Sequence, residues 1–344
     1  MVSIGQVNFE DYLSGKADLI DKELEAFFRR GPEVPNLSDA ARYSMGLDID
    51  DRKKRGKRIR PVLCLLASES LGGSAEMAMP MALASEILHN FLLVHDDIED
   101  DDKVRRDRPA VWAKFGLAHG INIGDYLFAK TYEAAMGCVE RGLERERAVK
   151  LMQLITRTIV HTGEGQALDI GARDRRDITV DEYLHITIEK TGYYLACPAI
   201  GGALVAGADE KTLAALEEFG KCIGPVFQIT DDVIDLTEGK GRGGVKGSDI
   251  MEGKRSYLVV HAASKCTDAE RKHLYQILDK PRSETTAKDV VWATGLFEKY
   301  GSVDAARKAG KEYLDRGRRV LEPLPEALRE NVFAASRYML DRKR

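Results

Sequence analysis

Two clusters of carboxylates, separated by more than a hundred residues, have the clearest chemical potential in this chain. Both have the spacing i, i+1, i+4, and they comprise Asp96, Asp97, Asp100, Asp231, Asp232 and Asp235. On a helix, residues i and i+4 share a face, so the carboxylates of each cluster converge and repel one another unless a cation lies between them. Mg²⁺ takes oxygen ligands and commonly binds one or two carboxylates together with substrate phosphates. The spacing therefore indicates a Mg²⁺-dependent site for a substrate that carries phosphate.

The second cluster is the more informative of the two. An acidic run at a helix end, as in the first cluster, is often no more than a solvated face. The second cluster lies inside the apolar segment "FQITDDVIDL", with Gln228 one turn before it. Charged residues on an apolar face are costly unless they are paired or bound to metal. Two facing helices with such clusters would form a metal cage at one end of a helical bundle.

Basic residues accompany the acidic clusters. They lie in "RGKRIRP", after the first cluster, in "EKTG" and in "EGKRS", and they comprise Lys57, Arg60, Arg105, Arg106, Lys190 and Lys254. Any one of them alone is more simply a solvated surface charge. Together with two acidic clusters, they suit a polyphosphate held both by Mg²⁺ and by direct cation contacts.

The segments that must position these groups have helical apolar spacing. Apolar residues recur at steps of three and four in most segments, and we find no convincing strand alternation. Pro80, Pro198 and Pro225 fall inside helical patterns and predict kinks or breaks, while the glycine-rich stretch 237–249 predicts a loop. We therefore expect an all-α chain with one domain over residues 1–344, core motifs within 55–260 and C-terminal helices over 265–344.

Composition restricts the classes of protein. Hydrophobic residues make up 44% of the 344 residues, which argues against wholesale disorder. The net charge of -4 does not support a nucleic-acid partner. The five cysteines lack CxxC spacing, the N-terminus does not have the pattern of a signal peptide, and no apolar run approaches the length of a membrane span. The expectation is a cytoplasmic protein without an integral membrane segment.

In the order of its motifs, the chain resembles the trans-isoprenyl diphosphate synthases, the polyprenyl synthetase family. The resemblance is carried by "GKRIRP", "HDDIEDDDKVRRDRPA", "GQALD", "EKTG", "FQITDDVIDL" and "GSDIMEGKRS". It implies an isoprenoid-synthase-type helical bundle around a deep central cavity, a homodimer, and about three Mg²⁺ ions per active site. It also implies the reaction, in which isopentenyl diphosphate is condensed with an allylic diphosphate.

The resemblance assigns roles to individual residues. The metal ligands would be Asp96, Asp97, Asp100, Asp231, Asp232 and Asp235. The allylic diphosphate would be bound by Arg105, Gln166, Lys190 and Lys254. Isopentenyl diphosphate would be bound by Lys57, Arg60, His89 and Arg106. The residues near the developing carbocation would be Thr191 and Gln228. The residues implied to act in catalysis are Asp96, Asp97, Asp100, Arg105, Lys190, Thr191, Gln228 and Asp231.

Two departures from the family pattern stand out. The family's glycine after the arginine pair is Asp107 here, and a family lysine aligns with Gly244. Whether Lys240, Arg242 or Lys246 replaces that lysine is open.

Product length is predicted from the residues before the first cluster. In the family, bulk four and five residues before DDxxD sets the cavity floor, and those positions are Leu92 and Phe91. Helix geometry places Leu92 about 40° from Asp96, whereas Phe91 lies about 140° away and must reach across or meet a neighbouring helix. An aromatic residue five residues before the motif, with none at the fourth, resembles the family's short-chain members that make the twenty-carbon product. We therefore expect geranylgeranyl diphosphate as the main product, with farnesyl diphosphate next.

Other classes of protein remain open. A longer-chain synthase, a class I terpene cyclase and a non-catalytic subunit of a heteromeric synthase share parts of the pattern, as does an acidic helical protein that only binds divalent ions. The intact second cluster and "GKRIRP" favour the chain-elongating enzyme over these alternatives.

Overall fold

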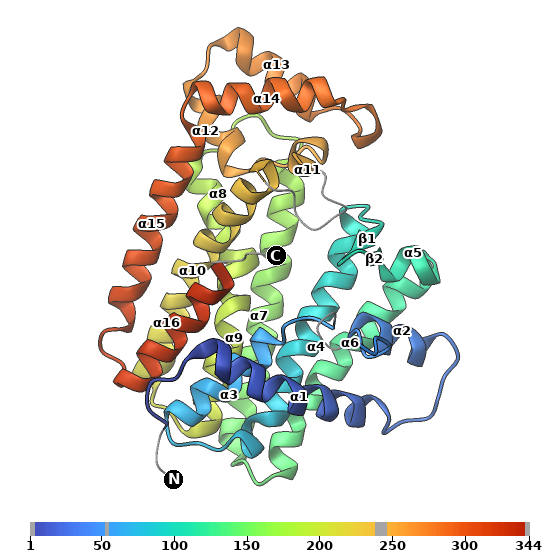
Figure 1. Ribbon diagram of the computed structural model, residues 1–344, viewed down its shortest axis with the longest axis vertical. Helices are drawn as coiled ribbons and strands as arrows, with labels where there is room; N and C mark the ends of the chain where they lie inside the picture. The colour runs from blue at the N-terminus through green and yellow to red at the C-terminus, as the bar shows by residue number, and fades with distance from the viewer. Residues whose placement is uncertain (1–3, 52–54, 238–245, 341–344) are drawn as a thin grey trace. The chain divides into compact units, whose positions relative to one another are not determined.

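The computed structural model describes residues 4–51, 55–237 and 246–340, and its regular structure is almost entirely helical (Figure 1). The helices before residue 142 are α1 (Phe9–Phe28), α2 (Leu37–Ser44), α3 (Ile59–Ser70), α4 (Ala75–Glu99), α5 (Val111–Phe115) and α6 (Leu117–Glu140). Those that follow are α7 (Arg145–Ala172), α8 (Val180–Thr187), the π-helical segment η2 (Ile188–Gly192), α9 (Tyr193–Ala206) and α10 (Glu210–Thr237). The last are α11 (Ser248–Met251), α12 (Tyr257–Lys265), α13 (Asp268–Leu278), the 3₁₀ turn η3 (Arg282–Glu284), α14 (Ala287–Lys299), α15 (Ser302–Leu321) and α16 (Glu326–Leu340). The predicted all-α class is confirmed.

Strand structure is limited to one short hairpin that the sequence did not predict. Strands β1 (Val104–Arg105) and β2 (Arg108–Pro109) pair in antiparallel fashion. Two-residue strands are too short to show alternation, so the periodicity that reveals longer strands is missing here.

The described residues form two compact units. The first unit comprises residues from 1–157, 196–217 and 321–343, and the second comprises 158–195 and 218–320. The expectation of one domain over the whole chain stays a prediction.

In the first unit, α4 is the central helix. It packs against α3 on one side and α6 on another, and α16 also packs on α3 (Figure 1). Glycines allow the closest approaches: a Cβ built on Gly202 of α9 would lie 2.0 Å from the carbonyl oxygen of Cys64 on α3. A Cβ on Gly124 of α6 would lie 2.0 Å from the ring of His95 on α4. Gly202 therefore lets α9 approach α3, and Gly124 lets α6 approach the end of α4 that carries the first acidic cluster.

In the second unit, a core of buried residues joins α8, α10, α12, α13, α14 and α15. Its members include Tyr183, Ile229, Leu258, Leu274 and Phe297, all at most 5% exposed. The ring of His273 on α13 lies 4.3 Å from that of Trp292 on α14, and Figure 1 shows the two helices side by side. This core supports the segment of α10 that carries the second acidic cluster.

The three prolines do not break their helices. Pro80, Pro198 and Pro225 lie inside α4, α9 and α10, so the prediction of breaks is wrong. At Pro80 the facing residue of α6 is Gly137, and a Cβ there would lie 3.1 Å from the proline ring. The glycine therefore leaves room for the proline ring between α4 and α6.

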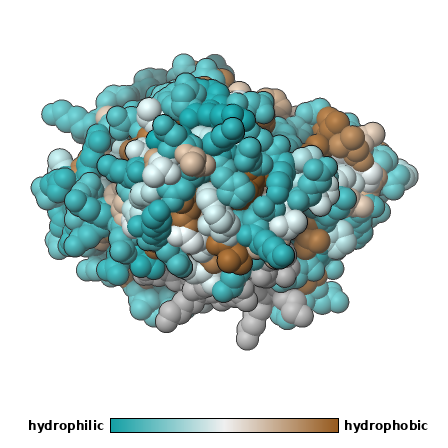
Figure 2. Space-filling model, turned by 90° about the horizontal axis from the view of Figure 1, so that it is seen from above, coloured by the Kyte–Doolittle hydropathy of each residue, from teal (hydrophilic) through white to brown (hydrophobic). Residues whose placement is uncertain are grey.

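One described helix, α4, is long and apolar enough to cross a membrane by length and composition, which the sequence analysis did not expect. However, 78% of its apolar window is buried within the structure, as in the core helix of a folded unit. The face of the molecule in Figure 2 is mainly hydrophilic, with smaller hydrophobic areas.

Candidate active site

The first acidic cluster lies in the last turn of α4, and backbone contacts fix that end. The indole N–H of Trp112 donates to the carbonyl oxygens of Asp97 and Asp102, at 3.0 and 2.9 Å. The backbone N–H of Asp102 also donates to the carbonyl oxygen of Asp97 at 2.8 Å. The chain is therefore tied down directly after Asp96 and Asp97, and their carboxylates start from a fixed backbone.

The hairpin returns Arg105 onto the cluster. Its Nε donates to Oδ1 of Asp97 at 2.7 Å, and its Nη2 contacts the same oxygen. The guanidinium also lies 3.7 Å from Asp96 and 3.9 Å from Asp102. Burial raises the pKa of Asp97 to about 6, although Arg105 opposes this rise. The first cluster therefore combines closely spaced carboxylates with one arginine that neutralises part of their charge.

The turn of the hairpin accounts for one departure from the family pattern. Arg106 and Asp107 have φ values of 53° and 58°, which is the left-handed conformation. Glycine adopts this conformation at no steric cost, and aspartate tolerates it better than most residues. Asp107 can therefore occupy the position of the family's glycine without changing the turn.

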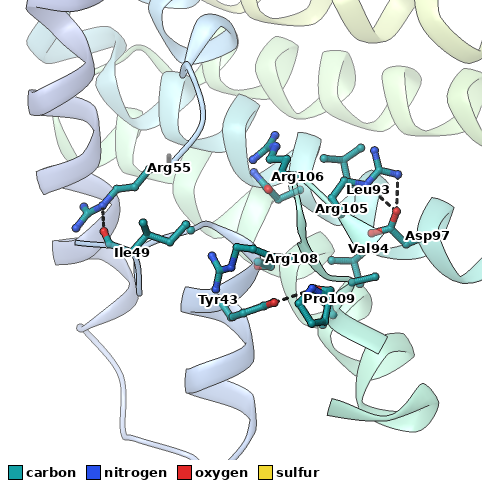
Figure 3. Close-up of a pocket in the computed structure, with 15 residues that line it drawn as sticks. Tyr43, Ile49, Arg55, Leu93, Val94, Asp97, Arg105, Arg106, Arg108 and Pro109 are labelled. Atoms are coloured by element: carbon teal, nitrogen blue, oxygen red, sulfur yellow. Dashed lines mark hydrogen bonds and ion pairs between the residues drawn. The ribbon is translucent and has the colours of Figure 1, made fainter. Parts of the chain in front are cut away.

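A small cavity beside the cluster has a basic wall. Its volume is about 50 Å³, and the side chains around it include Arg55, Arg105, Arg106 and Arg108 (Figure 3). Arg108 lies over the ring of Tyr43 at 4.0 Å, and the Tyr43 hydroxyl donates to the carbonyl oxygen of Pro109 at 2.8 Å. Sequence reasoning missed Arg55, Arg108 and Tyr43.

The loop that carries Lys57 lies beside the hairpin and leads into α3, whose first turn holds Arg60. A Cβ built on Gly56 would lie 3.1 Å from Nη1 of Arg106, so this glycine makes room for the guanidinium. Burial of its guanidinium lowers the pKa of Arg106, and the nearby charges of Arg58, Arg105 and Arg60 lower it further, against the effect of Glu86. The predicted isopentenyl-diphosphate ligands Arg60 and Arg106 thus lie close enough for their charges to repel each other.

The other two predicted isopentenyl-diphosphate ligands are Lys57 and His89. Lys57 is exposed, with its ammonium 5.3 Å from the ring centroid of Tyr338. His89 is half-buried on α4, about two turns before the acidic cluster.

Between Lys57 and Arg60, Arg58 has a structural role that the sequence did not reveal. It is 2% exposed and forms ion pairs of 2.7 Å with both Asp21 and Glu86. Its Nη2 also donates to the carbonyl oxygen of Met45 at 2.7 Å. Arg58 therefore anchors the end of this loop at the start of α3.

The second acidic cluster lies near the end of α10, and its three members differ in surroundings. Asp232 is 3% exposed and accepts hydrogen bonds from the Tyr183 hydroxyl at 2.7 Å and the Tyr257 backbone N–H at 3.0 Å. The side-chain amide of Gln228 donates to its other oxygen at 3.1 Å. Burial, followed by the charge of Asp232, raises the pKa of Tyr183, so the tyrosine remains a donor. Asp231 is half-buried and lies next to this network.

Asp235 connects α10 to the segment "GSDIMEGK". It is fully buried and accepts from the Ser248 hydroxyl at 2.5 Å and the Asp249 backbone N–H at 3.1 Å. Lys254 follows at the end of the same segment, where its ammonium lies 2.9 Å from Glu252 and 3.8 Å from Asp249. Lys254 is thereby held close to the end of α10.

The "GQALD" and "EKTG" motifs meet where η2 lies against α7. A Cβ on Gly165 would lie 2.2 Å from the backbone nitrogen of Lys190, so only glycine permits this approach. The Lys190 ammonium donates to Asp169 at 2.6 Å. Thr191 is 7% exposed, and Gln166 is half-buried one residue after Gly165. Asp169 was not among the predicted site residues, although "GQALD" contains it.

Each unit therefore gathers its own predicted site residues. The first contains the DDxxD cluster, Arg105 and the Lys57–Arg60 loop, and the second contains the other DDxxD cluster, Gln166, Lys190, Thr191 and Lys254. Of the candidates for the family lysine, Lys240 and Arg242 lie outside the described residues, as does Gly244, while Lys246 is exposed.

Comparison with known proteins identifies the family. The family model described as polyprenyl synthetase matches residues 50–294. The chain belongs to the polyprenyl synthetase family. This membership confirms the resemblance carried by the motifs, and the enzyme is a trans-prenyltransferase.

Individual relatives agree with this membership. The enzyme is 36% identical to the short chain isoprenyl diphosphate synthase of Methanothermobacter thermautotrophicus, over 84% of this chain and 87% of the relative. It is 36% identical to the geranylgeranyl diphosphate synthase of Methanosarcina mazei, over 84% of this chain and 86% of the relative. The crystal structure of geranylgeranyl pyrophosphate synthetase from Pyrococcus horikoshii matches with a TM-score of 0.84 at 30% identity, covering 98% of this chain and all of that one.

Proposed function

We propose that this prenyltransferase extends allylic diphosphates with isopentenyl diphosphate and that its main product is geranylgeranyl diphosphate. The observation that carries the proposal is the presence of two intact DDxxD clusters in one chain of this family, with cations placed beside them. Relatives named as geranylgeranyl diphosphate synthases support the choice of product.

The donor set fits Mg²⁺. The six cluster residues offer only carboxylate oxygens, which are the donors that Mg²⁺ prefers. Among them Asp96 and Asp231 are half-buried, so they are the least enclosed candidates for a first contact with a hydrated ion. Asp232 and Asp235 already accept hydrogen bonds from the protein and would orient the cluster as well as bind metal. Bound Mg²⁺ would stabilise the negative charge of the departing diphosphate.

The chain's own cations would share that charge. Arg105, Lys190 and Lys254 each already lie within 3 Å of a carboxylate, so their side chains are oriented before any diphosphate binds. Preorganised cations directed at developing negative charge stabilise the transition state without reorganisation. Lys57, Arg60 and Arg106 would hold the diphosphate of the second substrate, which must carry its double bond to the allylic carbon.

Product length is proposed to depend on a stack of aromatic rings. The Phe91 ring is 8% exposed and meets the rings of His95 and Phe128 at 5.3 and 5.6 Å. Phe128 lies on α6 and in turn meets Tyr132 at 5.5 Å. The Phe91 ring therefore contacts the neighbouring helix α6, as its position on α4 about 140° from Asp96 allowed. A wall of rings on α4 and α6 would limit how far the prenyl tail extends.

We also propose that the enzyme is a cytoplasmic homodimer. Helix α6 leaves Leu117, Ile121, Phe128, Met136 and Val139 exposed, each by 38% or more. An apolar set of this kind on one helix suits association with a second copy of the chain.

The deciding experiment incubates purified enzyme with isopentenyl diphosphate and each short allylic primer in Mg²⁺, and sizes the products. We expect release of pyrophosphate and a twenty-carbon diphosphate. Cyclic hydrocarbons would indicate a terpene cyclase, and no turnover by the folded chain alone would indicate a non-catalytic subunit or a plain ion-binding protein. Asp96→Ala and Asp231→Ala should lower turnover by about 10²–10³ or more. Asp101→Asn, in an exposed acid of the same run, is the matched control and should remain near normal.

A further inference from the structure

A group of imidazole and carboxylate side chains gathers on the second unit and shares no residue with either DDxxD cluster. Nδ1 of His161 lies 2.6 Å from Glu189 and 3.8 Å from Glu164. The ligand atoms of these three residues all lie within 4.8 Å of one another. Nδ1 of His185 lies 3.9 Å from the other oxygen of Glu189, so a second imidazole is within reach.

The fold builds this group from two elements that it holds firmly together. His161 and Glu164 lie one turn apart on α7, and Glu189 lies in η2. The contact of Gly165 with the backbone of Lys190 presses η2 onto α7 directly beside them. Any side chain at Gly165 would push Glu189 away, so the approach of the ligands is a property of the local packing.

The imidazole of His161 is also fixed in orientation. It stacks on the ring of Tyr193 with centroids 3.7 Å apart and planes 3° from parallel. The ammonium of Lys221 lies 5.3 Å from the centroid of the same tyrosine ring. A ring held in this way keeps Nδ1 directed at Glu189 and Glu164, as metal-ligating histidines require.

We propose that His161, Glu164 and Glu189 form a site for a divalent transition metal of the Zn²⁺ type, with His185 available as a fourth ligand. Zn²⁺ binds imidazole nitrogen and carboxylate oxygen at about 2.0–2.2 Å in tetrahedral geometry, so neighbouring donors lie about 3.4 Å apart. The observed separations of 2.6, 3.8 and 3.9 Å bracket that value. All three ligand atoms lie within 4.8 Å of one another, so binding needs changes in donor separation of about 1.4 Å at most.

The donor set separates this site from the Mg²⁺ clusters. Imidazole suits Zn²⁺, Cu²⁺ and Ni²⁺, whereas sites made only of carboxylates suit Mg²⁺. Glu164 and His185 are 63% and 61% exposed, which gives an ion a path from solvent. A bound ion would connect α7 to the π-helical segment that carries Lys190 and Thr191, and would fix that segment in place.

The test uses the full-length, metal-stripped enzyme titrated with Co²⁺ in a large excess of Mg²⁺, followed by visible absorption. We expect one equivalent to give the intense bands of four-coordinate Co²⁺ with nitrogen ligation, and Zn²⁺ to displace it. His161→Ala and Glu189→Gln should each weaken binding at least about tenfold to a hundredfold, since even outer partners of metal ligands are worth that much.

Controls distinguish this site from the catalytic clusters. His119→Ala, in an exposed histidine on α6, should leave the bands unchanged. Asp96→Asn should also keep them, even though it impairs prenyl transfer, so a failure of the proposed function would not be mistaken for a failure here. Because Glu164 is exposed, Glu164→Gln tests the site without disturbing the core. Bands that are absent, or that persist unchanged in the folded His161, Glu164 and Glu189 variants, would overturn the proposal.

Discussion

Replacing Arg58 with methionine should destabilise the first unit strongly, although the substitution keeps an unbranched side chain of comparable length. The Arg58 guanidinium is buried between Asp21 and Glu86, which are 4% and 3% exposed. Burial tends to lower the pKa of Arg58, but the charges of Glu86 and Asp21 outweigh this effect and raise it. The three charges therefore stabilise one another in a region from which water is excluded.

The magnitude follows from what the substitution leaves behind. Removing one partner of a buried ion pair typically costs about 3–5 kcal/mol, because the remaining charge stays buried without compensation. Asp21 keeps Arg55 as a partner at 3.7 Å, so the charge of Asp21 destabilises the variant less than that of Glu86. Residue 58 has a left-handed φ of 52°, which strains the backbone equally with arginine and with methionine. This strain therefore does not change the free energy of unfolding between the two. We therefore expect a loss of about 3–4 kcal/mol in the free energy of unfolding.

Urea denaturation followed by circular dichroism measures this loss. The midpoint should fall clearly in Arg58→Met, less in Arg58→Lys, and hardly at all in Arg29→Met, a matched change at an exposed arginine. Adding Glu86→Gln to Arg58→Met should recover part of the lost free energy of unfolding, since it removes the buried carboxylate charge that Arg58 no longer compensates. A loss below about 1 kcal/mol in Arg58→Met would refute the role of the buried network.

Three further predictions follow from individual contacts. Lys57→Ala should raise the KM for isopentenyl diphosphate by about tenfold to a hundredfold. Lys190→Ala should raise the KM for the allylic diphosphate or lower kcat by a similar factor. Steady-state kinetics with each substrate varied in turn would measure both effects. Phe91→Ala should lengthen the products seen by chromatography, and Phe128→Ala should lengthen them less. Unchanged products from a folded Phe91→Ala enzyme would mean that the ring only packs the core. In that case the substitution would lower only the free energy of unfolding, by about 3–5 kcal/mol. Hydrogen bonds from Lys299, Tyr300 and Thr267 lower the pKa of Glu270 to about 2 from its ordinary 4.5, so its contribution to stability is present above pH 4.5 and lost as the pH falls toward 2. Thermal melts of Glu270→Gln should lack that part of the pH dependence.

The helices and the chemistry of the site could be predicted from sequence because both repeat at short range. Steps of three and four define α4 and α10, and the i, i+1, i+4 spacing places each acidic cluster on one face. The same spacing says nothing about which acid meets which donor. Asp232 and Asp235 accept hydrogen bonds from residues far along the chain, including Tyr183, Tyr257 and Ser248. Such pairings arise only when the helices pack.

Arg58 and Asp169 were missed for a related reason. In "RGKRIRP" four of the seven residues are basic, and nothing local distinguishes Arg58, which is buried, from Lys57, which is exposed. Asp169 becomes informative only when Gly165 brings the backbone of Lys190 against α7. A glycine that permits a close approach is visible in a sequence, but its partner is not.

The contacts of the cations bear on how the enzyme would bind a diphosphate. Arg105 is held by Asp97 and Lys190 by Asp169, each at a hydrogen-bonding distance. A diphosphate must compete with these carboxylates, and it can do so because it offers more negative charge and more acceptor oxygens than one carboxylate. The carboxylates also hold each side chain in one orientation, so little rotamer freedom is left to lose on binding. In the proposed reaction, the carboxylates beside the cations would thus weaken the ground-state attraction for substrate while they keep the cations oriented for the charge that develops on the leaving group.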